Sequence, residues 1–504
     1  MSGEGTYTDV FGHRYTGKWS NNKREGKGTY SFVGQKKNES LSTEFLYFKG
    51  NRYVGEWKED RFHGKGSFKY LNGDSYEGEW EMDMRSGKGI FISNQGEHYE
   101  GEWESDMKHG VGEMDFINGD HYKGEWKQDM MSGDGQMVYV NGDSYKGYWV
   151  KNLKEGQGTY LYQNGEKYDG VWLNDVRSGE GIYKYNNGDI YEGNWADGIK
   201  EGYGIYKDSK GDLYEGEWEY DLKMGEGILK YANGDEYNGG WQNGKKEGQG
   251  KATFITDGIT YIGNFKDDLF HGKGKYTSSI GDSYDGEWEF GKKEGQGVFK
   301  SSIGDVYDCN WKNDMKHLKG VYQFADGSQY NGEWQNDEIT GRGSFTFSNG
   351  SVCKGSFLNG KIDGQGTFDY INGDKYNGLF KSGKRDGQGT CIFSNDEKYI
   401  GEWKEDEIDG QGKYIYRNGN TYEGTFIGGV MEGQGTYSFN NGNLYIGEFK
   451  DGKREGLGVF TYENGNKYVG EFKNGTMDGQ GTFTYPNGDK KVGVWKDGKP
   501  INNQ

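Results

Sequence analysis

The sequence predicts an all-β protein, an elongated single-layer antiparallel sheet built from tandem β-hairpins. Three observations support this fold class. A pattern of about 23 residues recurs over nearly the whole chain, apolar or glycine positions alternate with charged ones in both halves of each repeat, and 93 of the 504 residues are glycine. Alternation at a period of two is typical of strands, and the glycine density excludes helix. One repeat array, rod-like in shape, therefore replaces the usual several domains.

The first predicted strand of each repeat runs from a tyrosine, here called position 0, to an aromatic residue at position 4. All 15 tryptophans occupy position 4, as Trp80 does after Tyr76, and six further repeats carry Phe there. Position 2 is glycine in all but one repeat, in which Cys309 replaces it. These aromatic residues define 21 repeats.

A polar, glycine-bearing turn follows position 4. The second strand is expected over positions 11 to 17, which are residues 87–93 in the repeat that starts at Tyr76. It carries glycine at positions 11 and 13 and, in most repeats, Tyr or Phe at position 15. The link to the next repeat is typically x-N-G-D, as in residues 71–74, which suits a three-residue hairpin loop with glycine in the left-handed conformation.

Register follows from the requirement that the aromatic residues share one face. Inside a repeat we expect position 4 to oppose 11, 2 to oppose 13, and 0 to oppose 15, and the three-residue link gives the same partners across repeats. The rows would then be aromatic, glycine, and alternating Trp or Phe with glycine, where the missing side chains leave room for the rings. The opposite face would be solvated, with Glu79 against Lys88 as an example.

The array is expected to run over residues 1–504 without a break in its pattern, apart from two departures. Residues 35–49 form an insertion between the first two repeats. One extra residue between Tyr237 and Tyr261 predicts a bulge near Ala252. The array starts and stops in the middle of a repeat, and counting half-repeats gives 42 strands.

The two edges of the predicted sheet differ in how well they are protected. Lys490, Lys491 and Pro500 blunt the C-terminal edge, whereas the N-terminal strand GEGTYT carries neither lysine nor proline. A homodimer through a terminal strand edge would therefore use the N-terminal strand.

The composition favours an intracellular, cytoplasmic protein with protein partners. Aromatic residues make up 16% of the chain and there are only two prolines, which argues against disorder despite a mean hydropathy of -1.07. A net charge of -19 disfavours nucleic acid and a flat anionic membrane as principal partners. Cys309, Cys353 and Cys391 occupy ordinary repeat positions, as expected in a reducing compartment. No membrane span or signal peptide is expected.

The motifs Y-x-G-x-W, G-x-G-x-Y and N-G-D-x-Y at this period resemble MORN repeats (membrane occupation and recognition nexus). The resemblance implies a twisted single-layer antiparallel sheet and a scaffolding role, since MORN proteins occur in cilia and flagella, including radial spoke heads, in parasite cytoskeletal rings and at membrane junctions. Others are fused to lipid kinases or methyltransferases, and no such domain fits outside these repeats. Cys309, Leu318 and Cys353 depart from the pattern within residues 307–357.

The aromatic and glycine face is the main candidate site. It would form a groove for a partner's helix or extended segment, or serve only as the core of a one-layer sheet. The residues predicted to line this groove are Tyr76, Gly78, Trp80, Gly87, Gly89, Tyr99, Gly101, Trp103, Tyr122, Gly124, Trp126, Tyr145, Trp149, Tyr168, Trp172, Tyr191, Trp195, Tyr214 and Trp218.

Basic pairs at some hairpin tips are a second candidate site, for acidic lipid headgroups. Such pairs occur at five of 21 tips, beside acids, and are more often solvated turns. The residues considered for lipid contact are Lys245, Lys246, Lys292, Lys293, Lys453 and Arg454.

The sequence offers no catalytic, cofactor-binding or metal-binding set. His63 and His109, like His271 and His317, occupy position 10 two repeats apart. Four strands span about 19 Å, whereas zinc ligands lie about 2 Å from one ion. The many acids are exposed on a ladder, with no enclosed pocket and no nucleophile with a base.

The leading hypothesis is a non-enzymatic structural scaffold that docks other proteins. The resemblance alone suggests subunits of a ciliary or flagellar axoneme, of the radial-spoke type, or of a related cytoskeletal complex as its partners. The alternative is a membrane-proximal adaptor that binds acidic phospholipids through the hairpin tips. A third hypothesis is a regulatory arm of a separate kinase or methyltransferase.

Overall fold

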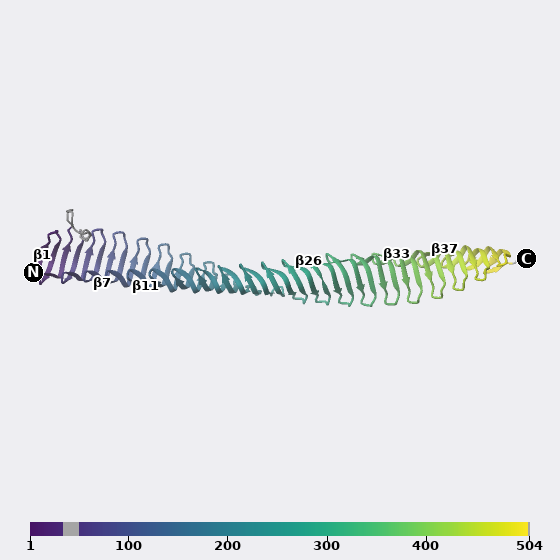
Figure 1. Ribbon diagram of the computed structural model, residues 1–504, viewed down its shortest axis with the longest axis horizontal. Helices are drawn as coiled ribbons and strands as arrows, with labels where there is room; N and C mark the ends of the chain where they lie inside the picture. Colours follow the sequence, from purple (N-terminus) through teal and green to yellow (C-terminus); the bar gives the residue numbers. More distant parts are fainter. Residues whose placement is uncertain (34–49, 502–504) are drawn as a thin grey trace. The chain divides into compact units, whose positions relative to one another are not determined.

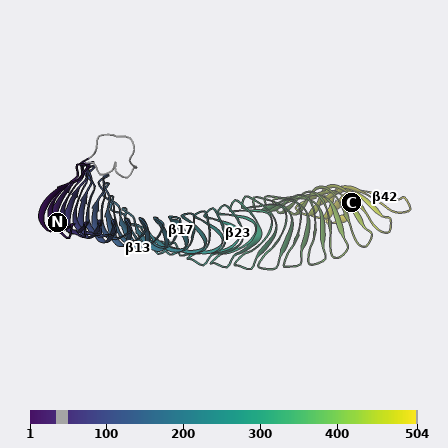
Figure 2. The same ribbon diagram turned by 60° about the vertical axis from the view of Figure 1, so that its left-hand side comes forward.

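The computed structural model describes residues 1–33 and 50–501, and all the regular structure within them is antiparallel strand (Figure 1). The predicted fold class is confirmed. The chain divides into two units, residues 1–247 and 248–504, and within each unit successive hairpins lie side by side (Figure 2). The insertion predicted at residues 35–49 lies outside the described residues. No helix in the described ranges could span a membrane.

The first unit contains twenty complete strands, namely a single strand at its start, two for each of the first nine repeats, and the first strand of the tenth. They are β1 (Gly3–Thr8), β2 (Arg14–Ser20), β3 (Lys23–Ser31), β4 (Arg52–Lys58), β5 (Arg61–Lys69), β6 (Ser75–Glu81), β7 (Met84–Ile92), β8 (His98–Glu104), β9 (Met107–Asp115), β10 (His121–Lys127), β11 (Met130–Val138), β12 (Ser144–Val150), β13 (Leu153–Leu161), β14 (Lys167–Leu173), β15 (Val176–Lys184), β16 (Ile190–Ala196), β17 (Ile199–Lys207), β18 (Leu213–Glu219), β19 (Leu222–Lys230) and β20 (Glu236–Gln242).

Strand β21 (Lys245–Phe254) includes the unit boundary, and the second unit continues the same pattern. Its strands are β22 (Ile259–Lys266), β23 (Leu269–Thr277), β24 (Ser283–Glu289), β25 (Lys292–Lys300), β26 (Val306–Lys312), β27 (Met315–Gln323), β28 (Gln329–Gln335), β29 (Glu338–Thr346), β30 (Val352–Leu358), β31 (Lys361–Asp369), β32 (Lys375–Lys381), β33 (Lys384–Ile392), β34 (Lys398–Lys404), β35 (Glu407–Ile415), β36 (Thr421–Ile427), β37 (Val430–Ser438), β38 (Leu444–Lys450), β39 (Lys453–Thr461), β40 (Lys467–Lys473), β41 (Thr476–Thr484), β42 (Lys490–Lys496) and β43 (Lys499–Pro500).

The turn inside each repeat is shorter than predicted. In the repeat that starts at Tyr76, β6 ends at Glu81 and β7 already begins at Met84. The two residues between them, Met82 and Asp83, both have positive φ, 51° and 69°. This is the geometry of a two-residue type I′ hairpin turn, which Asp, Asn and Gly adopt readily. The predicted start of the second strand at Gly87 was therefore three residues too late.

Inside the repeat, the predicted register is confirmed at the end of the hairpin away from the turn and is wrong near the turn. Gly78 pairs with Gly89 as predicted, but Trp80 pairs with Arg85 and not with Gly87. A β-bulge in β7 absorbs the difference, and Gly87 takes a φ of +57° there. Because only glycine adopts this conformation without strain, position 11 is glycine to permit the bulge.

The link between repeats matches the prediction. The Tyr70 N–H donates to the Asp74 carbonyl at 2.9 Å, which closes a three-residue loop, and Gly73 has a φ of +97°. Across the following link, Phe91 pairs with Tyr99 and Gly87 pairs with Trp103. The aromatic and glycine rows expected between neighbouring repeats are therefore present.

Two smaller predictions were wrong. The pairing of β21 with β22 is regular through Ala252, which opposes Tyr261, so no bulge lies there. The extra residue lengthens the link instead, because Phe254 pairs with Ile259 and leaves four residues in the loop. The described residues also contain 43 strands, one more than expected, because Lys499–Pro500 pairs with the end of β42.

Side chains tie neighbouring turns together at both ends of the hairpins. At the two-residue turns, the Arg85 N–H donates to Oδ1 of Asp106, one repeat later, at 2.7 Å. At the links, the Asn94 N–H donates to Oδ1 of Asp74, one repeat earlier, at 2.8 Å. These bonds satisfy backbone donors that the strand ladder leaves unpaired.

Candidate functional site

On the aromatic face, each position 0 tyrosine lies flat over the glycine pair of its own repeat. A Cβ atom built on Gly78 would lie only 2.5 Å from Oη of Tyr76, and one on Gly89 would also overlap the ring. The Tyr76 hydroxyl donates to the Glu79 carbonyl at 2.9 Å. Glycine at position 11 was expected to leave room for the tryptophan ring. In the structure the glycines at positions 2 and 13 leave the room, and the tyrosine ring occupies it.

The tryptophans pack edge-on between successive tyrosines. Trp103 lies 5.1 Å from Tyr99 and 5.4 Å from Tyr76, measured between ring centroids, with interplanar angles near 90°. Its indole N–H donates to the Gly89 carbonyl at 3.2 Å. Edge-to-face contacts of this kind add to the hydrophobic energy of burial.

The predicted groove residues therefore form an interior row. Every tyrosine and tryptophan in that set has at most 6% of its surface exposed. Burial raises the pKa of these tyrosines, to about 12 at Tyr168. The rings that remain half-exposed on this face lie at positions 15 and 17, as Phe91 and Tyr70 do.

A cation lies between neighbouring rings in many repeats, a feature that the sequence pattern did not predict. The Arg85 guanidinium lies 4.0 Å from the ring centroid of Trp103, and its Nε lies 3.3 Å from Oδ1 of Asp106. Arg85 occupies position 9, which the two-residue turn places opposite position 4. The basic residues over rings at this position are Arg24, Arg85, Lys108, Lys154, Arg177, Lys200, Lys223, Lys246, Lys293, Lys316, Arg385 and Arg454.

This arrangement divides the residues considered for lipid contact into two kinds. Lys246 lies over Tyr237, Lys293 over Trp311 and Arg454 over Phe460, so these three point onto the aromatic face. Burial there lowers the pKa of Lys293 and Arg454. Their sequence neighbours Lys245, Lys292 and Lys453 occupy position 8 and have exposed side chains. Once the turn is known to be two residues long, the alternation of faces along the strand predicts that position 9 points onto the aromatic face and position 8 points away from it.

The three unusual residues of 307–357 disturb this packing locally. Cys309 fills the glycine row, and Tyr307 lies instead against Tyr322, with ring centroids 4.0 Å apart. Leu318 replaces the bulge glycine and keeps its positive φ, 56°. Where Cys353 replaces tyrosine, Cδ1 of Ile362 occupies the space above the glycine pair.

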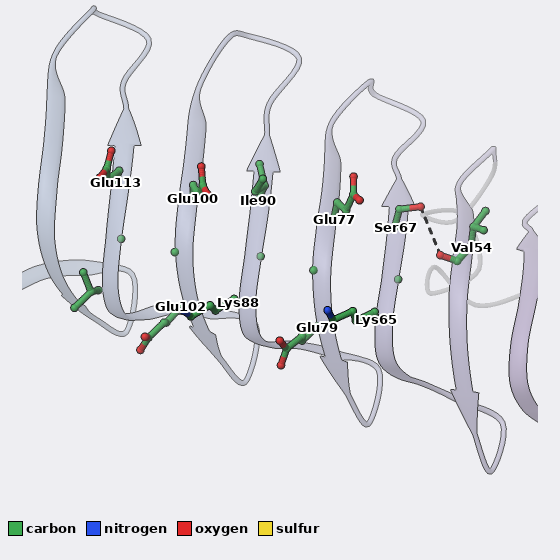
Figure 3. Close-up of a pocket in the computed structure, with 16 residues that line it drawn as sticks. Val54, Lys65, Ser67, Glu77, Glu79, Lys88, Ile90, Glu100, Glu102 and Glu113 are labelled. Atoms are coloured by element: carbon green, nitrogen blue, oxygen red, sulfur yellow. Dashed lines mark hydrogen bonds between the residues drawn. The ribbon is translucent and has the colours of Figure 1, made fainter.

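The opposite face of the first unit carries a shallow furrow of about 970 Å³ over the glycine stripe (Figure 3). Its floor is backbone at the paired glycines. One wall holds positions 1 and 14, including Glu77, Glu100 and Glu113, and the other holds positions 3 and 12, including Glu79 and Glu102. Five glutamates and two lysines line it, so the furrow is acidic.

The position 3 glutamates have a structural role as well. Oε2 of Glu402 accepts the Gln411 N–H at 3.0 Å, which places the carboxylate over the bulge glycine. Across the link, Lys88 opposes Glu102. The expected pairing of Glu79 with Lys88 inside one repeat was wrong, because the bulge separates these two residues.

The described residues contain no group of three or more His, Cys, Asp or Glu that could hold a metal ion. The three cysteines are buried, and burial raises the pKa of the Cys391 thiol to about 11. A thiol with so high a pKa is a weak nucleophile at neutral pH.

The MORN-repeat family model matches twenty segments of the chain, from residues 15–35 to residues 468–490. The chain belongs to the MORN-repeat family. The match covers twenty repeats and not the 21 counted in the sequence, because the half-repeat at Lys491 lies outside it. No curated protein matches the chain.

A comparison with solved structures found matches of low overall similarity to this MORN-repeat protein. One is the SAS-4 (dCPAP) TCP domain of Drosophila melanogaster in complex with a proline-rich motif of Ana2, at 18% identity over 35% of this chain and 90% of that chain, with a TM-score of 0.22. Another is the TCP10 domain of CPAP from Danio rerio, at 10% identity over 54% of this chain and 99% of that chain, with a TM-score of 0.13. Scores this low do not indicate a shared global fold.

Proposed function

We propose that this protein is a non-enzymatic scaffold that docks other proteins along the exposed surface of its MORN array. The observation that carries the proposal is how variation is distributed over the repeat. Positions 0, 2, 4 and 13 on the aromatic face keep the same residue types, whereas positions 1, 3, 12 and 14 on the opposite face change from repeat to repeat. A constant interior with a varied surface suits recognition of different partner segments at defined spacings.

The acidic furrow is the first surface that we assign to a partner. Its five glutamates favour a segment rich in Lys or Arg, and its backbone floor admits an extended chain. On the aromatic face, a partner would contact the half-exposed rings at positions 15 and 17 above the buried row. We further propose, on the family's occurrence, that the partners are subunits of a ciliary or flagellar axoneme, such as a radial-spoke-type complex, or of a related cytoskeletal structure.

Affinity purification combined with fluorescence localisation tests this proposal. The triple variant Glu77→Lys, Glu100→Lys, Glu113→Lys reverses the furrow, and Glu192→Lys, Glu215→Lys, Glu423→Lys is its matched control outside the furrow. We expect co-purification with cytoskeletal subunits that only the furrow variant abolishes. A chain that binds nothing, or whose partners tolerate the furrow variant, contradicts the docking surface. Diffuse cytoplasmic signal contradicts the axonemal placement alone.

The alternative proposal is a membrane-proximal adaptor that binds acidic phospholipids. It is supported by the exposed lysines at position 8, namely Lys245, Lys292 and Lys453, because each basic residue near an anionic surface adds about 1 kcal/mol. Flotation with vesicles that contain phosphatidylserine would show binding, and Lys245→Glu, Lys292→Glu, Lys453→Glu would abolish it. Absence of flotation excludes this alternative.

Two further proposals concern assembly. A homodimer through the edge of β1 would show as concentration-dependent mass in analytical ultracentrifugation, and Tyr7→Pro in that strand would abolish it. A regulatory arm of a separate enzyme would show as a kinase or methyltransferase that co-purifies with the chain.

A further inference from the structure

The charged face of the first unit changes character over three consecutive hairpins, β12–β13, β14–β15 and β16–β17. At the end of each hairpin, positions 5 and 8 oppose each other on this face. They are Val150 with Leu153, Leu173 with Val176, and Ala196 with Ile199. We call these six residues the apolar patch.

The apolar patch is exposed. Leu173 has 50% of its surface exposed, and Val150, Leu153 and Val176 have 38–40%. Ala196 and Ile199 are half-buried. Side chains of this type are normally placed inside a protein, so three adjacent pairs on a solvated face mark an interaction surface.

Neighbouring residues extend the patch along the same face. Tyr148 and Val171 occupy position 3, where ten other repeats carry glutamate, and Tyr148 is 46% exposed. Val171 packs over the bulge glycine Gly179, as the glutamates do elsewhere. Val176 reaches the next hairpin, because a Cβ built on Gly198 would lie 3.4 Å from its Cγ1. The patch is therefore continuous from the second of these hairpins to the third, and in the first hairpin Tyr148 opposes Glu155.

The two hairpins that flank the patch carry charge at position 5. Lys127 faces Met130 in the hairpin directly before the patch, and Glu219 faces Leu222 in the hairpin directly after it. Position 3 is glutamate on both sides, at Glu125 and Glu217. The patch is thus an apolar centre with a position 3 glutamate beyond each end of its length.

We infer that the apolar patch docks an amphipathic helix of a partner protein, with an apolar face about four turns long and Lys or Arg at both ends. Six strands at about 4.8 Å spacing span about 24 Å, which about 16 residues of helix match at 1.5 Å per residue. A one-layer sheet lacks the second layer that helices commonly supply in globular proteins. Glu125 and Glu217 attract basic helix ends, and the net charge of -19 disfavours a second copy of this chain as the occupant.

This inference goes beyond the proposed function, because it assigns a separate surface and one class of partner to it. The probe is a synthetic 18-residue peptide with Leu at i, i+3, i+4 and i+7 and two Lys at each end. Two control peptides keep its composition with the Leu spacing scrambled, or replace the terminal Lys by Glu. Binding of each fluorescent peptide to the full chain is measured by anisotropy.

We expect the basic amphipathic peptide to bind at least tenfold more tightly than either control. The variant Leu173→Asp, Val176→Asp should weaken this binding at least tenfold, and Glu125→Lys, Glu217→Lys should weaken it several-fold. The matched control is Ile427→Asp, Val430→Asp, since this pair lies at the same positions in the second unit. Both substituted pairs are exposed and near turns, so circular dichroism should be unchanged.

The inference is overturned if the scrambled peptide binds equally well, if the amphipathic peptide does not bind, or if the two aspartate variants have the same effect. It is also overturned if ultracentrifugation shows a dimer of the chain that Leu173→Asp, Val176→Asp dissociates, because the occupant would then be a second copy.

Discussion

The two units fill the space between neighbouring rings in different ways. In residues 1–247, position 4 is Trp in all ten repeats, and position 9 is Lys or Arg in eight of them. In residues 248–504, Phe replaces Trp in six of eleven repeats, and only four keep a basic residue at position 9. The others carry Phe, Ile, Met or, at the end, Pro, as at Ile362 and Met431.

The turn residues change with the rings. Position 7 is Asp or Asn in eight of the ten repeats of the first unit, and glycine in seven of the eleven in the second. Asp106 binds both the backbone N–H and the guanidinium of Arg85, whereas Gly452 at the corresponding place next to Met431 has no carboxylate to do so. Where position 7 is glycine beside an arginine, its carbonyl accepts the guanidinium instead, as at Gly198 and Gly475. A large ring, a cation and a carboxylate thus form one cooperative set in repeats such as that of Arg85.

Alkaline pH is expected to produce the largest effect. Burial raises the pKa of position 0 tyrosines, to about 12 at Tyr168 and Tyr445, so the folded state keeps protons that the unfolded state loses from about pH 10. Stability is therefore present below pH 10 and lost as pH rises towards 12. Tyrosinate absorbance and circular dichroism should change together.

Buried lysines act in the opposite direction in both units. Burial lowers the pKa of Lys108, Lys200 and Lys293, and neutralising a buried ammonium favours folding as pH rises. The tyrosines with a raised pKa outnumber these lysines, so both units should lose structure in alkali. Tryptophan emission and the circular dichroism signal should therefore change over the same pH range.

Removing the tyrosine ring should cost most where it lies over two glycines. Tyr76→Ala is expected to destabilise its hairpins by about 3–5 kcal/mol, because it leaves a cavity and an unsatisfied carbonyl. Tyr307→Ala should cost only about 1–2 kcal/mol, since Cys309 already displaces that ring. Hydrogen exchange of the flanking strands measures both. Equal protection losses would show that the glycine pair does not matter.

Exchanging the residues at position 9 tests the cooperative set. Arg85→Met should destabilise the first unit by about 1–2 kcal/mol through loss of the contacts with Trp103 and Asp106. Met431→Arg in the second unit should give no gain, because Phe449 and Gly452 offer a smaller ring and no carboxylate. Local hydrogen exchange is again the measurement, and stabilisation by Met431→Arg would refute the cooperative set.

The smallest expected effect is at Leu318. A side chain at a φ of 56° is strained, so Leu318→Gly should stabilise β27 and its neighbours by about 1 kcal/mol. The matched change in the first unit, Gly87→Leu, should destabilise by at least as much, because its Cβ would also overlap the Glu79 carboxylate. Thermal unfolding, followed at each site by hydrogen exchange, measures whether each substitution stabilises or destabilises the strands.

The fold was predictable because its rows depend on residues that repeat. The spacing of Tyr76, Gly78 and Phe91, with the x-N-G-D link, was enough to predict the strands and the pairing across links. The error near the turn arose because the alternation of faces was counted from Trp80 without allowing for a bulge. Nothing in the sequence of a single strand indicates that Gly87 has a left-handed backbone conformation. The position of the Arg85 cation depends on that geometry and was therefore missed, whereas a buried aromatic core was one of the two alternatives that the sequence left open.

The apolar patch was missed for another reason. Its residues are ordinary strand formers, and only the observed pairing of positions 5 and 8 brings Leu173 and Val176 together on the charged face. The extra residue near Ala252 was assigned to the wrong element, since a strand bulge and a longer link give the same residue count.

The hydrogen bonds that connect successive turns run in opposite directions at the two ends of the hairpins. At the short turns the carboxylate belongs to the later repeat, as Asp106 does, and at the links it belongs to the earlier one, as Asp74 does. Severing the array between two repeats that carry both carboxylates consequently leaves one orphaned amide on each fragment. Neither fragment ends cleanly, so deletions and fusions at repeat boundaries need a capping carboxylate supplied on both sides of the cut.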